Sequence, residues 1–301
     1  MNIPNPAPKR HDGGSGENTK ADPIDTQNFL RRTASALVLA PLAILAAYLG
    51  GWIFAAVCAA TATLVLWEWS ALTRSDDRLI LAAGLPALLA AAISAEVGAP
   101  DVAIAVTAAG AFIAAIAMTA LPHRDRPTNA AGWAAAGILY AAIVAICPIL
   151  LRQDPQMGFA ALLFLFATVW STDVFAYLVG RKIGGPLLWP RLSPKKTWAG
   201  AVGGLAGGVV AGSIVAYASA GTHLGTGGVL ALILSIAAQA GDLLESAVKR
   251  RFGVKDASAL IPGHGGVMDR VDGLLVAALV AVLIGVLHVN MATPAGGLLL
   301  W

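Results

Sequence analysis

The stretch from Ser246 to Gly273 holds the densest group of chemically active side chains in the chain. It reads SAVKRRFGVKDASALIPGHGGVMDRVDG and contains five Lys or Arg residues, three Asp, one His and five Gly. Carboxylates beside many cations are typical of Mg²⁺-dependent phosphate chemistry, in which one or two carboxylates and the substrate phosphates hold the metal. The stretch therefore predicts a phosphate-handling site.

The helix expected just before this stretch carries a polar stripe. Four residues spaced i, i+3, i+4 and i+7 share one helix face, namely Asp242, Glu245, Ser246 and Lys249. Ionisable groups within an apolar span are costly, and they indicate a functional site by default. An ion pair that joins two helices is the simpler alternative, although it leaves Ser246 and the second carboxylate unexplained.

Two further polar groups lie at the ends of apolar segments. Asp173, Tyr177 and Arg181 share one face at the end of an apolar helix, where a structural hydrogen-bonding role for Asp173 is the alternative. Asp269 and Asp272 begin another helix, whose dipole favours carboxylates at that end. With two acidic helices in the same chain, a shared site is favoured.

Glycine and histidine residues precede the last of these helices. Gly265 and Gly266 allow a tight turn that presents backbone amides to an anion. His264 either donates a hydrogen bond to a phosphate or has a purely structural role.

The segment 181–197 supplies a second basic element. It contains Ser193, Lys195 and Lys196 just before an apolar span. A phosphate clamp is one interpretation, and membrane topology with attraction to anionic lipid is the other. The glycines that follow, including Gly204 and Gly208, predict that this span packs closely against its neighbours.

The rest of the chain must position these groups. Of its 301 residues, 57% are hydrophobic and 12% are charged, and the mean hydropathy is +0.74. Apolar segments of about 17–25 residues, the length that crosses a bilayer as a helix, predict an all-α polytopic membrane protein. About nine transmembrane helices are expected, at 34–50, 52–73, 79–97, 101–121, 131–151, 158–180, 198–218, 226–248 and 271–291.

The basic residues predict the orientation of these helices. Nineteen of the 20 Lys and Arg residues fall in the N-terminal tail or in loops on one side, and Arg152 lies on the other. Basic residues mark the cytoplasmic side, so the N-terminus is expected in the cytoplasm and the C-terminus outside. The regions expected are a disordered cytoplasmic tail (1–30), N-terminal transmembrane helices (31–157), a catalytic transmembrane region with a cytoplasmic-face active site (158–293) and a short tail (294–301).

These motifs resemble the signature of phosphatidate cytidylyltransferases, also called CDP-diacylglycerol synthases. The resemblance runs from Ser246-x-Val248-Lys249-Arg250 through Lys255-Asp256 to Pro262-x-His264-Gly265-Gly266-x-x-Asp269-Arg270-x-Asp272. The Ser-Pro-Lys-Lys-Thr run at 193–197 and the run from Asp173 to Gly180 are also similar, and the resemblance covers about 165–275. It implies a multi-pass enzyme of the inner or plasma membrane that joins CTP to phosphatidic acid, giving CDP-diacylglycerol and pyrophosphate.

The resemblance also implies roles for the site residues. It implies Mg²⁺ held by Asp242 and Asp269, and it is compatible with K⁺ beside the Mg²⁺ and with a homodimer. The full set of expected metal ligands is Asp242, Asp269, Glu245 and Asp272. The expected catalytic residues are Lys249, Arg250, Lys255, Arg270, Ser246 and His264. The expected substrate-binding residues are Lys195, Lys196, Ser193, Asp173, Tyr177, Arg181, Gly265 and Gly266.

Two other classes of function stay open. A transporter of an anionic lipid would use intramembrane carboxylates, but the charges gather at one membrane face and the two halves show no inverted repeat. Another CTP-dependent lipid enzyme, such as a polyprenol kinase, would transfer the γ-phosphate instead. No nucleic-acid partner is expected.

Overall fold

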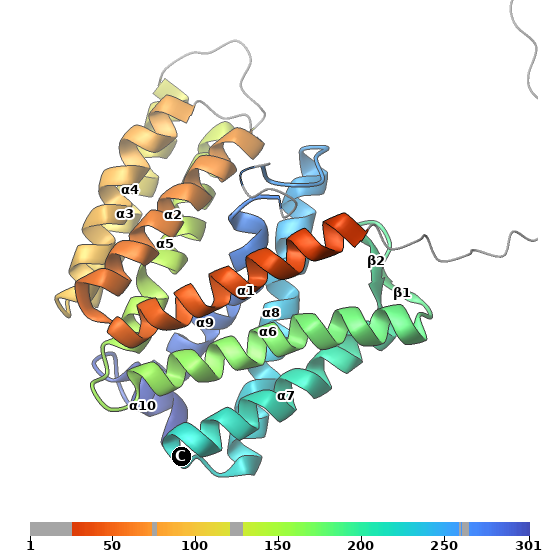
Figure 1. Ribbon diagram of the computed structural model, residues 1–301. Coiled ribbons are helices and arrows are strands. Elements are labelled where there is room, and N and C mark those ends of the chain that lie inside the picture. The colour runs from red at the N-terminus through yellow and green to blue at the C-terminus, as the bar shows by residue number, and fades with distance from the viewer. Residues whose placement is uncertain (1–25, 74–76, 121–128, 259, 261–264) are drawn as a thin grey trace, which may run out of the picture.

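The described part of the chain is almost entirely helical. The computed structural model describes residues 26–73, 77–120, 129–258, 260 and 265–301, which form ten helices and one two-stranded hairpin (Figure 1). The elements are α1 (Thr26–Leu49), α2 (Gly51–Thr73), α3 (Asp77–Glu96), α4 (Pro100–Ala120), α5 (Ala130–Arg152), α6 (Gly158–Ile183), β1 (Leu187–Trp189), β2 (Ser193–Thr197), α7 (Trp198–Ala220), α8 (Leu224–Arg251), α9 (Met268–His288) and α10 (Pro294–Leu299).

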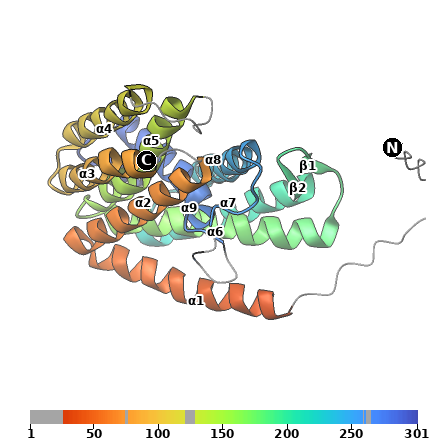
Figure 2. The same ribbon diagram turned by 90° about the horizontal axis from the view of Figure 1, so that it is seen from above.

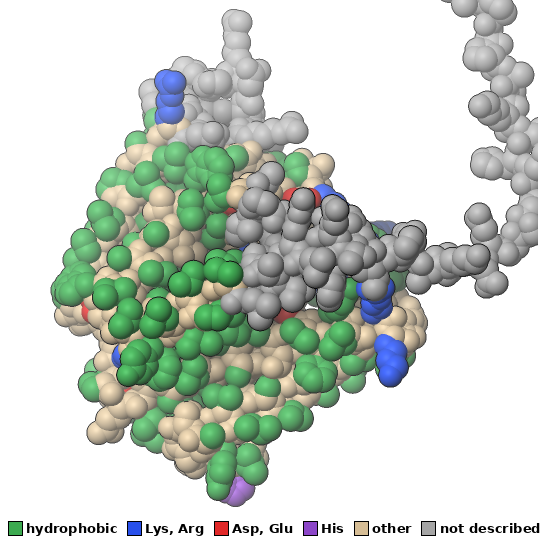
Figure 3. Space-filling model, in the orientation of Figure 1, with side chains coloured by type: hydrophobic (Ala, Val, Ile, Leu, Met, Phe, Trp, Pro, Cys, Tyr) green, Lys and Arg blue, Asp and Glu red, His purple; other side chains and the backbone are tan. Residues whose placement is uncertain are grey.

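Most of these helices can cross a membrane. Within the described residues, the eight helices α2 to α9 are long and apolar enough to do so, while the described apolar part of α1, Val38–Leu49, is shorter. Hydrophobic side chains cover much of the visible face, and Lys and Arg side chains project at its upper and right-hand edges (Figure 3). The predicted class, an all-α polytopic membrane protein, is confirmed.

The helices form two groups with α9 between them. Helices α2 to α5 pack against one another on one side, and α6, α7 and α8 pack together on the other (Figures 1 and 2). Helix α9 contacts members of both groups, namely α2, α5, α6 and α8. Helix α9 therefore links the two groups.

Glycines let α7 lie close against α6. A Cβ atom on Gly204 would lie 2.8 Å from the carbonyl oxygen of Thr172, and one on Gly200 would lie 2.8 Å from that of Ala176. Larger side chains would force the two helices apart. The predicted close packing of this span is confirmed.

Two segments differ from the predicted boundaries. The segment 181–197, expected as a loop, contains the antiparallel hairpin β1–β2, in which Trp189 pairs with Ser193. Helix α8 continues to Arg251, beyond its predicted end at 248, and α9 begins at Met268 instead of 271. Basic residues in the last turn of α8 and Asp269 in the first turn of α9 favour both extensions through the helix dipoles.

A polar cluster ties helix ends together far along the bundle from the hairpin. Arg152 donates hydrogen bonds to the last carbonyls of α1, and Gln153 donates to the last carbonyls of α3. Asp154 accepts the backbone N–H groups of Gln156 and Met157, just before α6, and of Gly296 in α10, each at 2.9 Å. We call Arg152, Gln153 and Asp154 the capping cluster. Helix α10, which lies in the stretch expected as a short tail, is buried.

Candidate active site

Two glycines allow α8 and α9 to approach where their carboxylates lie. A Cβ atom on Gly241 would lie 2.5 Å from the carbonyl oxygen of Asp272, and one on Gly273 would lie 3.1 Å from that of Ala238. Gly241 directly precedes Asp242, and Gly273 directly follows Asp272. The close approach therefore brings acidic residues of two helices to one place.

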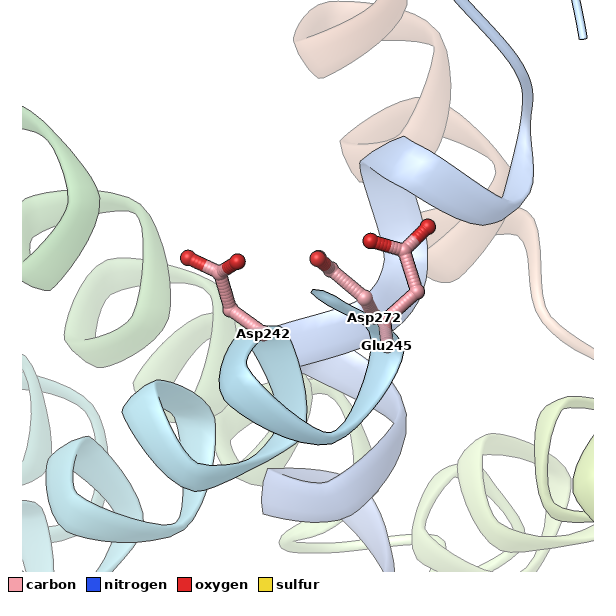
Figure 4. Close-up of side chains that lie close together, drawn as sticks. All are labelled: Asp242, Glu245 and Asp272. Atoms are coloured by element: carbon pink, nitrogen blue, oxygen red, sulfur yellow. The ribbon is translucent and has the colours of Figure 1, made fainter. Parts of the chain in front are cut away.

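Three carboxylates meet between these helices. Asp242 and Glu245 project from α8 and Asp272 from α9, toward the same space (Figure 4). One ligand oxygen of each residue lies within 4.8 Å of the other two. Glu245 is buried, with 1% of its surface exposed, while Asp242 and Asp272 are half-buried. We call these three residues the acid group; charges so close repel unless cations neutralise them.

Lysine side chains supply part of that neutralisation. Lys249 Nζ lies 2.5 Å from Glu245 Oε2 and 2.7 Å from Asp269 Oδ1. Lys196, from β2, forms an ion pair with Asp242. Each of the two predicted basic elements, the segments 181–197 and 246–273, thus brings a lysine to the acid group.

Two buried oxygens, one in the acid group and one on α5, lack a hydrogen-bond partner within the described part of the chain. They are Glu245 Oε1 and Tyr140 Oη, the latter from α5. Tyr140 lies within electrostatic range of all three carboxylates of the acid group. An unsatisfied buried oxygen costs about 1–3 kcal/mol, so the space beside Glu245 Oε1 favours a bound cation or water.

Asp269 faces the loop between α8 and α9. Its Oδ2 accepts the N–H groups of Gly266 at 2.7 Å and Ala257 at 3.2 Å, while its Oδ1 accepts Lys249. Gly265 has a φ of +81°, and a Cβ atom there would lie 2.5 Å from Asp269 Oδ2. Only glycine meets both demands without strain. The amide of Gly266 thus binds an anion of the chain itself.

Comparison with known proteins identifies the chain. The model of the cytidylyltransferase family matches residues 30–288. The chain belongs to this family. It is 52% identical over 164 residues to the phosphatidate cytidylyltransferase of Brucella suis biovar 1, a match that covers 54% of this chain and 61% of that protein.

Other relatives carry the same name. The chain is 55% identical over 154 residues to the phosphatidate cytidylyltransferase of Brucella abortus biovar 1, covering 51% of this chain and 57% of that protein. It is 45% identical over 130 residues to that of Haemophilus influenzae, covering 42% and 45%. The chain thus matches about three fifths of the length of the Brucella relatives.

Three of the expected site residues lie on α6 of this cytidylyltransferase-family chain. Asp173 of α6 lies within electrostatic range of Asp242, Lys196 and Arg270. Tyr177 and Arg181 are exposed on α6 and bond to each other, with 2.8 Å between Arg181 Nη1 and Tyr177 Oη. The predicted shared face of α6 is therefore present.

The remaining expected residues lie on α8, on the hairpin and in the loop. Arg250 Nε donates to the carbonyl of Leu192 at 3.2 Å, which joins the end of α8 to the hairpin. Ser193 and Ser246 are half-buried, and Lys195 and Lys255 are exposed. His264 lies outside the described residues.

One site-adjacent carboxylate was missed by the sequence reasoning. Glu68 of α2 is fully buried and accepts hydrogen bonds from Ser258, Val267 and Met268, at the end of the loop and the start of α9. The signal was available, because Glu68 is an acidic residue within an apolar span, between Trp67 and Trp69.

Proposed function

We propose that this chain transfers CMP from CTP to phosphatidic acid, giving CDP-diacylglycerol and pyrophosphate. The observation that carries the proposal is the acid group between α8 and α9, with Lys196 and Lys249 bound to it. The shared name of the relatives gives the substrates. Family membership supports nucleotide transfer over lipid transport.

The acid group suits a divalent metal. Its donors are all carboxylate oxygens, which Mg²⁺ prefers, and Glu245 Oε1 is buried without a partner among the described residues. Asp173 and Asp269 add two carboxylates nearby, against the cations Lys196, Lys249 and Arg270. Five carboxylates then face three cations, an excess that a divalent cation would offset.

We therefore assign Asp242, Glu245 and Asp272 as ligands of Mg²⁺. The family resemblance adds Asp269 as a further ligand and K⁺ as a second ion. When bound, Mg²⁺ would neutralise charge on the triphosphate and on the leaving pyrophosphate. Lys196 lies on a hairpin with 28% of its side chain exposed, so it can exchange Asp242 for a phosphate. Lys249 is held between two carboxylates and orients them.

The exposed cations handle the substrates in this proposal. Arg250, Lys255 and Arg270 stabilise the triphosphate, and Lys195 with Ser193 draws in the lipid phosphate. An oxygen of the phosphatidate phosphate attacks the α-phosphorus of CTP. The bond from that phosphorus to the bridging oxygen breaks, and pyrophosphate leaves with the electron pair. The nucleophile is already an oxyanion, so no covalent enzyme intermediate is required.

The basic residues also suggest the location. Ten of the 15 Lys and Arg residues outside the N-terminal tail lie at the end of α6, on the hairpin, at the end of α8 or in the segment from there to the start of α9. Cations mark the cytoplasmic side. We assign the active site to the cytoplasmic face of the cell membrane, where CTP is available.

Labelled CTP tests the proposal. Purified protein in detergent, with Mg²⁺ and phosphatidic acid, should place label from α-labelled CTP in the lipid product and label from γ-labelled CTP in pyrophosphate. Asp242→Asn should lower this turnover about 10²–10³-fold, the effect of removing one electrostatic group at a reacting centre. Asp101→Asn, at an exposed position on α4, is the matched control. Lipid labelled from γ-labelled CTP would indicate a kinase, and unlabelled lipid would leave the transporter.

A further inference from the structure

Glu68 is a buried carboxylate to which the proposed reaction assigns no role. It lies in α2, within an apolar span, and its exposed fraction is 0%. Carboxylates in such surroundings are very unfavourable unless hydrogen bonds or charges compensate them. Its partners therefore explain why it is there.

The three hydrogen bonds that Glu68 accepts from described residues come from the far end of the sequence. Oε1 accepts Ser258 Oγ at 2.6 Å and the N–H of Val267 at 2.8 Å, and Oε2 accepts the N–H of Met268 at 2.6 Å. Val267 is the N-cap of α9 and provides no side-chain cap of its own. Glu68 supplies that cap from another helix, at the end where the helix dipole favours negative charge.

Gly266 has the size that this contact requires. A Cβ atom on Gly266 would lie 2.6 Å from Glu68 Oε2 and 2.7 Å from Oε1. Any larger residue would push the carboxylate away from the backbone of α9. The second glycine of the Gly265-Gly266 pair thus makes room for Glu68, while the first makes room for Asp269.

The other end of the loop is held by neighbours of Glu68. Phe252, the C-cap of α8, packs edge-on against Trp133 of α5, with ring centroids 5.0 Å apart. Trp69, next to Glu68, donates from Nε1 to the carbonyl of Trp133 at 2.9 Å. Helices α2 and α5 thus hold both ends of the segment 252–268.

We infer that Glu68 is a positioning residue for the metal site, because it fixes the first turn of α9 against α2. That turn carries Asp269, and Asp272 follows in the next turn. Both must meet Asp242 and Glu245 on α8. The N-terminal helices then serve the site directly, beyond providing a membrane anchor. The inference rests on the proposed metal site, but it does not need the proposed substrates.

Binding of Mn²⁺ by the full-length protein in detergent, followed by EPR, tests this role. Mn²⁺ is the probe because it binds carboxylate sites that suit Mg²⁺. Gln in place of Glu68 keeps the size of the side chain but replaces one acceptor oxygen by an NH₂ donor. That donor would face a backbone N–H, so one hydrogen bond is lost. We expect Glu68→Gln to weaken Mn²⁺ binding about 10–100-fold, the usual effect of losing a residue that orients metal ligands. The same loss is expected in kcat, with a smaller change in the KM for CTP.

Two variants and one control complete the experiment. Ser258→Ala removes one contact and should weaken Mn²⁺ binding less than Glu68→Gln. Gly266→Ala keeps the Glu68 carboxylate but inserts a methyl group against it, so it should weaken Mn²⁺ binding as much as Glu68→Gln does. It replaces Glu68→Gln in the test if Glu68→Gln does not fold. Glu96→Gln, at the half-buried end of α3, should bind Mn²⁺ within twofold of the wild type.

The outcomes separate this inference from the proposed function. Mn²⁺ affinity within twofold of wild type in folded Glu68→Gln or Gly266→Ala protein would overturn the inference, even if the variant unfolds at a lower temperature. If the wild-type protein transfers no CMP but the variants still bind Mn²⁺ more weakly than it does, the inference is supported. That outcome counts against the proposed reaction alone.

Discussion

Polar side chains occupy both ends of the helix bundle, but they have different partners. In the capping cluster, Asp154 accepts three backbone N–H groups, and Arg152 and Gln153 donate to helix carbonyls. In the acid group, Asp242 and Glu245 bind lysine side chains instead, and one oxygen of Glu245 has no partner among the described residues. Both sets are costly within apolar surroundings, so their partners indicate what each set does.

The comparison shows how to separate structural from functional polar residues in this membrane protein. A hydrogen bond to a helix end cannot be exchanged without opening the helix end. An ion pair with a lysine on a hairpin can be exchanged for a phosphate or a metal ion. The capping cluster is therefore expected to control stability alone, and the acid group to control chemistry.

Glu68 and Asp269 combine both kinds of behaviour. They lie at the end of the bundle that carries the acid group, yet most of their hydrogen bonds come from the segment 257–268 and the start of α9. They stabilise a helix end and, in doing so, set the position of the chemistry.

The largest effect is expected at Lys249, where the two kinds of behaviour meet. Lys249→Met leaves Glu245 and Asp269 buried without their shared cation. Breaking a buried ion pair on one side costs about 3–5 kcal/mol, so both the unfolding free energy and the turnover should fall. Unfolding in detergent followed by tryptophan fluorescence, together with CMP transfer, measures both. A variant with wild-type stability would contradict the role of Lys249 as the compensating charge.

Asp272→Asn should separate chemistry from stability. One like charge is removed from the acid group, so the unfolding free energy should stay level or rise. Turnover should fall about 10²–10³-fold, because an electrostatic group at the reacting centre is lost. The same two measurements apply. Loss of stability with turnover within fivefold of wild type would place Asp272 with the capping cluster instead.

Added Mg²⁺ should stabilise the protein through the acid group. At a free concentration 100 times its Kd, Mg²⁺ should add about 2.7 kcal/mol to the unfolding free energy. EDTA should remove this gain and the turnover, and Asp242→Asn should abolish the Mg²⁺-dependent shift. An equal shift in Asp242→Asn would move the metal away from the acid group.

The acid group could be predicted from the sequence for a local reason. The spacing of Asp242, Glu245 and Lys249 places them on one face of any helix, whatever the helix packs against. The position of Glu68 depends on partners 190–200 residues away, and no local spacing encodes such a contact. The hairpin was missed because its two short strands, Leu187–Trp189 and Ser193–Thr197, are too short to show a period-two pattern.

The fold followed the same rule. Apolar segment lengths predicted the membrane helices, because the bilayer thickness sets that length. Helix ends were less accurate, as α8 and α9 extend through charged residues that a hydropathy pattern excludes.

Asp154→Ala should show the opposite behaviour to Asp272→Asn. Three backbone N–H groups lose their acceptor, so the unfolding free energy should fall by about 1–3 kcal/mol. Turnover per folded molecule and Mn²⁺ affinity should match the wild type, because the cluster lies at the end away from the hairpin. A loss of turnover larger than the loss of folded protein would end the division between the two ends.

The smallest effect is expected between the two ends, at the hydrogen bond that joins α6 to α8. Thr172 Oγ1 donates to the carbonyl of Thr168 at 2.8 Å, so the single hydroxyl hydrogen of Thr172 is used. Ser235 must then be the donor in the 2.6 Å contact between Ser235 Oγ and Thr172 Oγ1. Thr172→Val therefore leaves the buried hydroxyl of Ser235 without an acceptor. In Ser235→Ala, Thr172 Oγ1 loses a donor but still donates its own hydrogen bond to Thr168.

A double-mutant cycle on this pair measures the contact itself. Interhelical hydrogen bonds in membrane proteins average about 0.6 kcal/mol, because the unfolded chain finds other partners within the membrane. We expect a coupling of that size, with Thr172→Val more destabilising than Ser235→Ala and turnover unchanged in both. The pair lies on α6 and α8, the helices that carry Asp173 and Asp242. A tenfold loss of turnover with so small a coupling energy would mean that the spacing of α6 and α8 also determines the geometry of the acid group.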